Sequence, residues 1–315
     1  MRLPEPATER TLYFIGVTTG KSSIMQVYPR WAKEALGLGD TVIKGIDLEI
    51  HAPADDYRKV VEFIKNDPLS AGALVTTHKL DLYNAAKDLF EYLDPYAAMF
   101  GELSSISKKN GKLEGYAKDP ISSGLTLDSF VPPDYWSEKG GELFIMGAGG
   151  SAIAICSYML KPSNGDNIPS KVIVANRSLP RLLEIEKLVK QINPDVAAEY
   201  VLTPETRDND EILARIKPNS LVINATGLGK DRPGSPLSDS CVFPKDSLVW
   251  ELNYRGDLTF MKQAQAQTKE KNLYIEDGWT YFIHGWTQVV AEVFHIDITG
   301  EVFDACEKIA RDMRK

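Results

Sequence analysis

The sequence is poor in the residues from which metal centres and disulfide frameworks are built. Of its 315 residues, three are cysteine and four are histidine, and neither type forms a cluster. The cysteines, Cys156, Cys241 and Cys306, are odd in number and widely spaced, which fits free thiols in a reducing compartment better than disulfides. We therefore expect no metal site and a cytoplasmic location.

Long apolar runs and dense clusters of basic residues are also missing. No stretch approaches the roughly 20 apolar residues that a helix needs to span a membrane, and the first ten residues lack the apolar core of a signal peptide. The net charge of −8 is not offset by a local group of lysines and arginines, although such a group is what binds phosphate backbones. We expect a protein that associates with neither membranes nor nucleic acids.

The chain does have the length and composition of a globular protein with two domains. It is 43% hydrophobic and 25% charged over 315 residues. Short apolar runs alternate with helical patterns along both halves, and this order is typical of an α/β fold with mostly parallel sheets. The sequence Asp119-Pro120 interrupts the alternation, and the helical pattern resumes near residues 124–130.

The most informative motif is a glycine-rich turn between a predicted strand at residues 142–146 and a predicted helix at residues 151–160. Gly147 permits a tight turn, Gly149 lets the backbone approach a pyrophosphate, and Ala152 keeps the helix close to the strand. The helix N-terminus favours the negative charge of the phosphates. The motif has the spacing G-x-G-x-x-A of dinucleotide-binding proteins and consists of Gly147, Ala148, Gly149, Gly150, Ser151 and Ala152.

The next predicted strand, residues 171–175, ends in a sequence that bears on the choice of cofactor. A site for NAD usually has an acidic residue at this strand end, where it holds the ribose 2′-hydroxyl. Asn176, Arg177, Ser178 and Arg181 occupy the region instead, and arginine suits a 2′-phosphate because its guanidinium forms bidentate hydrogen bonds. The prediction is NADP(H); the alternative is that both arginines are solvated residues at a helix start.

Further strands are expected near residues 199–202, 220–224 and 247–252. With the glycine turn, they predict a Rossmann-type NADP-binding domain from residues 122–277. Residues 1–121 together with 278–315 would then form the second domain, an α/β catalytic and substrate-binding domain with a mostly parallel sheet.

Two charged residues of this other half follow predicted strands. Lys79 comes just after a strand at residues 72–76, and Asp119 follows a hairpin that turns at residues 109–111. Parallel strands deliver functional residues at their carboxyl ends. An amine beside a carboxylate near a nicotinamide can move the proton of an alcohol while hydride moves to the cofactor. On spacing alone, each residue could equally be a solvated loop charge.

The order of these motifs resembles that of the shikimate/quinate dehydrogenases, over nearly the whole chain. The resemblance implies an NADP(H)-dependent oxidoreductase that interconverts a ring alcohol and a ketone of a shikimate- or quinate-like hydroxy acid, an activity of aromatic amino acid biosynthesis. It also implies that Lys79 and Asp119 are the catalytic pair. The motifs that carry it are at residues 75–79, 115–119, 147–152, 176–181 and 224–227, and at Tyr254.

The resemblance also implies which residues contact the cofactor and which contact the substrate. The cofactor contacts that it adds, near the nicotinamide, are Asn224, Ala225, Thr226 and Gly227. The family's C-terminal substrate glutamine falls on Gly285, and His284 and Gln288 flank that position. The predicted substrate-binding residues are Ser23, Thr76, Ser104, Tyr254, His284 and Gln288.

The substrate motifs depart from the family pattern. The second serine of its Ser-x-Ser-Pro element falls on Met25, and the Asn-Thr pair before the catalytic aspartate is Ala117-Lys118. Removing one partner of a buried hydroxyl costs roughly 1–3 kcal/mol, so we expect an altered substrate pocket. A different anion clamp could come from Lys21, Ser22, Ser23, Tyr28, Arg30 and Lys118.

Two other functions stay open. A dehydrogenase of the folate-linked type shares the two-domain plan, but Asp119 and the arginines after residue 176 argue against it. A non-catalytic NADP(H)-binding redox sensor would fit the altered substrate motifs, but the presence of both Lys79 and Asp119 argues against it. A homodimer is compatible with either function.

Overall fold

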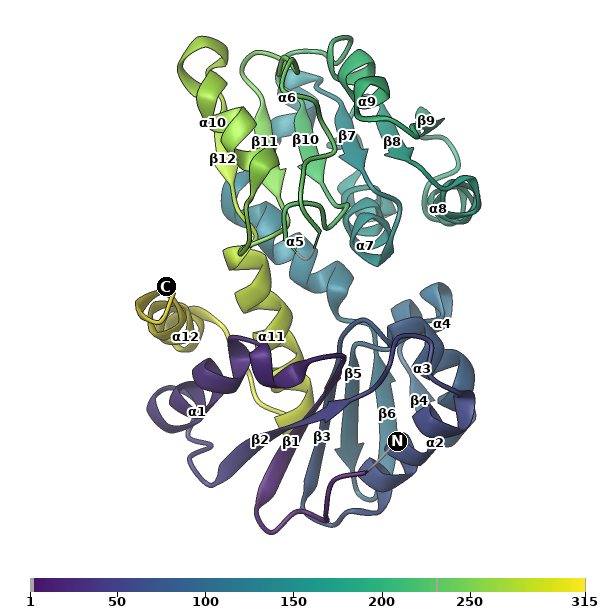
Figure 1. The fold of residues 1–315 in the computed structure, drawn as a ribbon, viewed down its shortest axis with the longest axis vertical. Helices are drawn as coiled ribbons and strands as arrows, with labels where there is room; N and C mark the ends of the chain where they lie inside the picture. The colour runs from purple at the N-terminus through teal and green to yellow at the C-terminus, as the bar shows by residue number, and fades with distance from the viewer. Residues whose placement is uncertain (1–2, 231, 315) are drawn as a thin grey trace. The chain divides into compact units, whose positions relative to one another are not determined.

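The computed structural model describes residues 3–230 and 232–314. The chain divides into two compact units (Figure 1), one made of residues up to 118 and from 285 onward, the other of residues 119–284. The domain boundaries predicted from the sequence, 121/122 and 277/278, lie a few residues away from these, and the roles predicted for the two parts stay predictions.

The first unit contains a mixed sheet with the strand order β2-β1-β3-β5-β6-β4. β1 is parallel to β2 and β3, whereas β5 is antiparallel to both β3 and β6. β3 and β6 therefore run in the same direction and end at the same edge of this sheet. The strands are β1 (Arg10–Gly16), β2 (Thr41–Asp47), β3 (Ser70–Val75), β4 (Tyr92–Leu93), β5 (Ser105–Lys109) and β6 (Lys112–Tyr116).

Helices α2 and α3 of this unit pack against each other and cover its sheet. Their shared core includes Tyr13, Ile15, Tyr57, Val60 and Leu82, all at most 1% exposed. On α2 the buried residues recur at helical spacing, which is why this segment forms a helix with one apolar face. The helices are α1 (Ile24–Glu34), α2 (Ala54–Asn66), α3 (Lys79–Ala86), α4 (Pro95–Phe100) and α12 (Gly300–Asp312), with short 3-10 turns η1 (Thr19–Lys21) and η2 (Lys87–Leu89).

The second unit contains a sheet that is parallel throughout, with the order β12-β11-β10-β7-β8-β9. Its central strands are completely buried, as expected for runs of apolar residues in a parallel sheet. After β9 the chain returns to the other side of β7, which creates a switch point between β7 and β10. The strands are β7 (Leu143–Met146), β8 (Val172–Asn176), β9 (Ala198–Leu202), β10 (Leu221–Asn224), β11 (Leu248–Glu251) and β12 (Tyr274–Glu276).

This strand order is that of the doubly wound Rossmann fold, and the predicted fold class is confirmed. One local prediction is wrong. The helix expected near residues 124–130 begins at Asp119, because Pro120 lies in its first turn, where the missing N–H needs no partner. The helices are α5 (Asp119–Phe130), α6 (Tyr135–Lys139), α7 (Gly150–Met159), α8 (Leu179–Ile192), α9 (Thr206–Leu213), α10 (Thr259–Lys271) and the start of α11 (Trp279–Phe294), with one 3-10 turn, η3 (Pro162–Asn164). The residues of α11 from 285 onward belong to the first unit.

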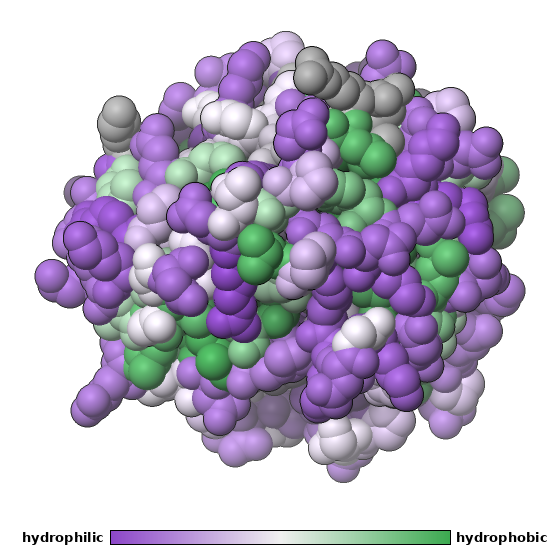
Figure 2. All heavy atoms as spheres, turned by 90° about the horizontal axis from the view of Figure 1, so that it is seen from below, coloured by the Kyte–Doolittle hydropathy of each residue, from purple (hydrophilic) through white to green (hydrophobic). Residues whose placement is uncertain are grey.

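The surface and the thiols are those of an ordinary globular chain. Hydrophilic residues dominate the face shown in Figure 2, and hydrophobic ones lie between them in smaller groups. The three cysteines are buried and free. Within the described residues, no helix is both long and apolar enough to cross a membrane, and no group of His, Cys, Asp and Glu side chains could hold a metal ion.

Candidate functional site

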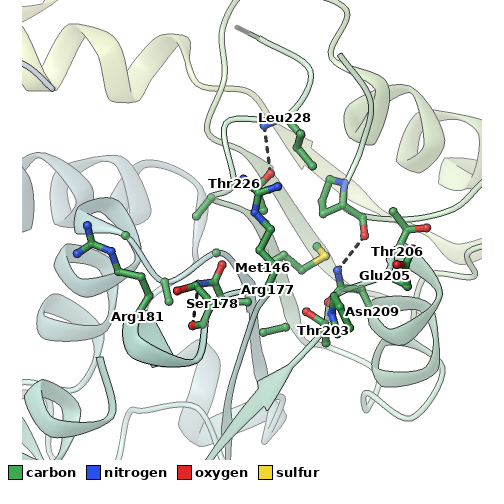
Figure 3. A pocket seen from close by; sticks show the side chains of 18 of the residues that line it. Met146, Arg177, Ser178, Arg181, Thr203, Glu205, Thr206, Asn209, Thr226 and Leu228 are labelled. Carbon is green, nitrogen blue, oxygen red and sulfur yellow. Dashed lines mark hydrogen bonds between the residues drawn. The ribbon is translucent and has the colours of Figure 1, made fainter. Parts of the chain in front are cut away.

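A cavity of about 490 Å³ lies where β7, β8 and β10 end in the second unit. Figure 3 shows side chains from several strand ends around it. Its place beside the switch point of the sheet is where doubly wound folds bind their ligands. The lining residues are Met146, Gly147, Ala148, Gly149, Ala175, Asn176, Arg177, Ser178, Arg181, Thr203, Pro204, Glu205, Thr206, Asn209, Ala225, Thr226, Leu228, Arg232 and Pro236.

The glycine turn forms the floor of this cavity. The two glycines that line it, Gly147 and Gly149, are needed for different physical reasons. Gly147 has a φ of 110°, and a Cβ there would lie 2.5 Å from the carbonyl oxygen of Ala225. Gly149 has an ordinary φ of −93°, and a Cβ there would meet nothing within 4 Å. The first glycine is therefore required by the fold, whereas the second leaves open space at the N-terminus of α7, where a phosphate would lie.

The other residues of the motif do not line the cavity, except for Ala148. Ala152 is fully buried in α7, and neither Gly150 nor Ser151 lines the cavity. These residues begin the helix whose N-terminus faces the open space. The predicted phosphate contact is thus concentrated on residues 147–149.

The two predicted arginines differ in their surroundings. Figure 3 shows Arg177 pointing across the cavity and Arg181 at its edge on the first turn of α8. Arg181 donates from Nη1 to Glu184 Oε2 at 2.7 Å, whereas Arg177 forms no ion pair with another described residue. Asn176 bonds locally, from Nδ2 to the Ser178 carbonyl at 3.3 Å. Arg177 is consequently the guanidinium better placed to bind a phosphate.

Several lining residues were missed by the sequence reasoning. Thr203 and Thr206 follow β9, a strand end that could have been searched once a parallel sheet was predicted. Arg232 had no comparable signal, because it comes from an irregular connection after β10. Glu205 also lines the cavity, but its carboxylate caps α9 in a reciprocal capping box with Asp208. The lining therefore has more cationic than anionic side chains.

The segment after β10 forms another wall. Ala225 and Thr226 line the cavity, whereas Asn224 is fully buried and turns its side chain away from it. Asn224 Nδ2 donates to Glu251 Oε2 at 2.9 Å, and its Oδ1 accepts from the Thr226 hydroxyl at 2.7 Å. Gly227, with a φ of 75°, makes the turn and does not line the cavity. Asn224 and Gly227 thus shape the loop that Ala225 and Thr226 present.

Lys79 stands at the start of α3, after an unusually tight turn. The backbone N–H of His78 donates to the Thr76 carbonyl, and Thr77 between them has a φ of 53°. A β-branched residue rarely adopts this conformation, so the turn is strained. His78 is 1% exposed, and its Nδ1 lies 3.0 Å from the Tyr57 hydroxyl. Burial lowers the pKa of His78, so a neutral imidazole anchors the turn that carries Lys79.

Asp119 is the first residue of α5, and Ser123 Oγ donates to its carbonyl at 2.7 Å. β3 leads into Lys79 and β6 leads toward Asp119. Lys79 belongs to the first unit, whereas Asp119 is the first residue of the second. Their joint role in catalysis stays a prediction.

The predicted substrate-binding residues are divided between the units. In the first, Ser104 is 2% exposed and its Oγ accepts from the Lys118 N–H at 2.7 Å, while Thr76 Oγ1 donates to the Ile15 carbonyl at 3.4 Å. Ser23 precedes α1, and Gln288 lies on α11; both are half-buried.

The other two belong to the second unit. Tyr254 packs against Phe282, with 4.7 Å between ring centroids, and His284 is 8% exposed, with its carbonyl accepting from Ser122 Oγ at 3.4 Å. Tyr254 and His284 therefore already contribute to the packing of this unit.

The structure also bears on the suggested anion clamp. Lys118 forms an ion pair with Glu292, and its Nζ lies 4.8 Å from the centroid of the Tyr116 ring. Arg30 pairs with Glu34 at 2.7 Å. Tyr28 is fully buried, with its hydroxyl 2.6 Å from that of Thr41. These three side chains already have partners within the first unit, so the clamp would have to come from Lys21, Ser22 or Ser23.

A Rossmann-type unit with a glycine turn, joined to a second α/β unit, defines the chain as a two-unit α/β protein of the Rossmann type. No protein-family model matches it. Shikimate dehydrogenase (NADP(+)) of Nitrosopumilus maritimus (strain SCM1) is 23% identical over 247 residues, which are 77% of this chain and 80% of that protein. The enzyme of the same name from Streptococcus sanguinis (strain SK36) is 25% identical over 228 residues, 72% and 74% of the two chains.

Solved structures share the fold over almost the whole chain. Quinate dehydrogenase from Corynebacterium glutamicum in complex with NAD has a TM-score of 0.74 at 19% identity, covering 96% of this chain and 99% of that one. Shikimate 5-dehydrogenase from Thermus thermophilus in complex with NADP(H) and shikimate has a TM-score of 0.70 at 19% identity, with coverage of 96% and 99%. A ligand-free 5-ketofructose reductase of Gluconobacter sp. strain CHM43 has a TM-score of 0.66 at 16% identity, with coverage of 98% and 100%.

Together, the sequence matches and the shared fold support this chain as a member of the shikimate/quinate dehydrogenase family, at modest identity. The resemblance indicated by the sequence motifs is confirmed. The proteins of this family named above are oxidoreductases, and that class is supported for this chain as well.

Proposed function

We propose that the protein is an NADP(H)-dependent oxidoreductase that interconverts a ring alcohol and a ketone of a shikimate- or quinate-like hydroxy acid. The observation that carries the proposal is the cavity at the switch point, where the glycine turn and Arg177 converge. The two relatives described above are named for NADP(+). One structural neighbour carries NAD, so the choice of cofactor rests on the residues of this cavity.

The residues of the cavity fit a 2′-phosphorylated dinucleotide. Gly149 leaves space for a pyrophosphate at the N-terminus of α7. The end of β8 has Asn176 and Arg177 where a site for NAD would have a carboxylate. The dinucleotide, when bound, supplies or accepts the hydride. Arg177 would hold its 2′-phosphate with charge-assisted hydrogen bonds.

Lys79 would move the proton of the substrate hydroxyl. When the alcohol is oxidised, its Nζ accepts that proton; when the ketone is reduced, Nζ returns a proton to the oxygen. Asp119 would hold the ammonium group in place through its negative charge. The rigid turn at Thr77 and the buried His78 fix the position from which Lys79 acts.

The substrate pocket is proposed to differ from that of shikimate dehydrogenases. Ser104 and Lys118 stand where the family has asparagine and threonine, and in this chain they are bonded to each other. The family fold also occurs in a 5-ketofructose reductase, so the fold alone does not fix the substrate. Side chains of the first unit that lack these partners, Ser22 and Ser23 among them, would then contact the substrate.

The test is a Lys79→Ala substitution. General acid–base catalysis contributes roughly 10²–10⁴-fold, so turnover should fall by that factor while NADPH binding is unchanged. Turnover is read from NADPH absorbance with a panel of cyclic hydroxy acids and the corresponding ketones. Lys33→Ala, on an exposed position of α1, is the control and should keep full activity. Wild-type turnover in the Lys79→Ala variant would contradict the mechanism.

A non-catalytic NADP(H) sensor is the second candidate. The observation in its favour is that Lys118 and Ser104, at substrate positions, are committed to partners within their own unit. NADPH binding without turnover across a broad panel of hydroxy acids, ketones and neutral polyols would favour the sensor.

A further inference from the structure

A buried carboxylate lies beside the cavity, outside every role assigned so far. Glu251 ends β11, has no exposed surface, and is the register partner of Asn224 at the end of β10. Its Oε2 accepts from Asn224 Nδ2 at 2.9 Å. Its Oε1 accepts from the backbone N–H and the side-chain Nδ2 of Asn253, at 2.9 and 2.7 Å. Three donors therefore converge on one carboxylate inside the protein.

The same donors hold the start of the connection that follows β10. The carbonyl oxygen of Leu228 accepts from Asn253 Nδ2 at 3.0 Å and from Asn224 Nδ2 at 3.3 Å. The Leu228 N–H in turn donates to Thr226 Oγ1 at 3.1 Å, and Thr226 donates to Asn224. The Nδ2 atoms of Asn224 and Asn253 each donate both to Glu251 and to the Leu228 carbonyl. The carboxylate, which does not line the cavity, is therefore bonded to both of the amides that hold this segment.

This segment brings several residues to the wall of the cavity. Ala225, Thr226 and Leu228 line it, and Arg232 follows, with its carbonyl accepting from the Gly229 N–H at 2.7 Å. Farther out, the Gly229 carbonyl accepts from the Leu258 N–H at 3.1 Å. Glu251 is therefore connected to the cavity wall through Asn224, Asn253 and the Leu228 carbonyl.

We propose that Glu251 is a positioning residue for cofactor binding: its carboxylate holds Asn224 and Asn253 so that Thr226, Leu228 and Arg232 are preorganised around the dinucleotide. The inference rests on the proposed function of the cavity as the NADP(H) site. Glu251 acts through its neighbours and exchanges no proton with the substrate. Loss of its charge should weaken cofactor binding and leave the rate at saturating cofactor nearly unchanged.

The ionisation of Glu251 supplies an independent signature. Burial raises the pKa of Glu251 to about 7, with a further rise from nearby Asp277, while hydrogen bonds from Asn253 and Asn224 oppose the shift. The ionised form accepts all three hydrogen bonds strongly, whereas protonation weakens them. Cofactor affinity should therefore fall as the pH drops through about 7. If Glu251 instead repelled the cofactor phosphates directly, cofactor affinity would rise as the pH drops.

The experiment compares Glu251→Gln with Glu142→Gln in the full chain. Glu142 is also a buried glutamate of the second unit, 7% exposed and bonded to the Lys217 N–H at 3.1 Å, but it precedes β7 at the far end of the strands. Dissociation constants of NADPH and NADH are measured from pH 6 to pH 9 by cofactor fluorescence. NADH lacks the 2′-phosphate, which itself titrates near 6, so it isolates the effect of the protein.

We expect Glu251→Gln to weaken the binding of both NADPH and NADH by about tenfold at pH 8. This factor corresponds to one charge-assisted hydrogen bond. The wild type should lose up to about tenfold in NADH affinity from pH 8 to pH 6, following its carboxylate fraction, and the variant should lose none. Glu142→Gln should bind like the wild type. Equal affinities for wild type and Glu251→Gln, or the same pH profile in both, would overturn the inference.

Amide hydrogen exchange in the absence of cofactor separates this inference from the proposed function. In Glu251→Gln the amides of Thr226 and Leu228 should exchange faster, whereas those in β7 should not. If Glu251→Gln fails to fold, Asn253→Ala, which removes one donor to Glu251 and one to the Leu228 carbonyl, takes its place. The amides of Thr226 and Leu228 should again exchange faster and cofactor affinity should fall at pH 8, while the pH dependence should persist because Glu251 is still present. If the wild type binds no NADPH, the proposed function fails, and unchanged exchange would by itself refute the role of Glu251.

Discussion

The two units of this protein use the ends of their strands in different ways. In the second unit, the ends of β7, β8 and β10 surround a cavity with Gly149 and Arg177 facing open space. In the first unit, polar residues before β5 and after β6 already have partners, as in the Ser104–Lys118 and Lys118–Glu292 pairs. The second unit thus presents groups that face open space, whereas Ser104 and Lys118 of the first unit are bound within that unit.

This difference shows which half of the proposed function the chain fixes most firmly. Binding a dinucleotide needs backbone space and one or two cations, and a short local sequence supplies both. Recognising a particular hydroxy acid needs several side chains from distant segments to be left without internal partners. The contrast would fail if substitutions in the glycine turn had no effect on cofactor binding. It would become more specific if Arg177 contributed more than Arg181 to the binding of NADPH.

The largest effect is expected at Gly147. Gly147→Ala would force a left-handed conformation on a side chain and push its Cβ to 2.5 Å from the Ala225 carbonyl oxygen. Strain and overpacking each cost about 1–3 kcal/mol, so the unfolding midpoint in urea should drop clearly and NADPH binding should be lost. Gly149→Ala is the matched control, because its Cβ meets nothing within 4 Å. That variant should keep its stability and lose only cofactor affinity.

The second effect concerns the choice between cofactors. Arg177→Ala should weaken NADPH binding by roughly 10–100-fold, because a charge-assisted hydrogen bond contributes about 1.5–3 kcal/mol, and should leave NADH binding nearly unchanged. Arg181→Ala should cost less, since Arg181 is already paired with Glu184. Titrations of both cofactors into both variants check this. If Arg177→Ala weakened NADPH and NADH equally, the 2′-phosphate contact would be wrong.

Much of the fold and part of the candidate site followed from local sequence. Buried apolar strands and the spacing of the glycines were enough to predict the parallel sheet, the turn at Gly147 and the strand end at Arg177. Arg232 could not be predicted, because no repeating pattern marks an irregular connection. Asn224 was assigned to the cofactor from its motif alone, while the residue that binds its amide, Glu251, lies 27 positions away.

Pairing between residues far apart in the sequence also limited the prediction of the substrate-binding residues. Lys118 was a candidate for an anion clamp because it falls on the Asn-Thr pair that precedes the catalytic aspartate in the family. Its partner Glu292 is 174 positions away on α11, a separation that no local pattern reveals. The helix that begins at Asp119 was missed for another reason, because Pro120 was read as a break, although proline is favoured in a first helical turn.

The smallest effect is expected at Thr77, and it tests whether the first unit contains a strained element of its own. Thr77→Gly removes a left-handed conformation that costs a branched residue about 1–2 kcal/mol, but glycine loses about 0.5–1 kcal/mol in chain entropy. The variant should be more stable by about 0.5–1 kcal/mol in urea unfolding, and its turnover should fall because the turn before Lys79 becomes mobile. Thr76→Gly, at an ordinary φ, is the control and should destabilise. A loss of stability in Thr77→Gly would mean that the Thr77 side chain contributes more than its strain costs, and that the turn is held by packing alone.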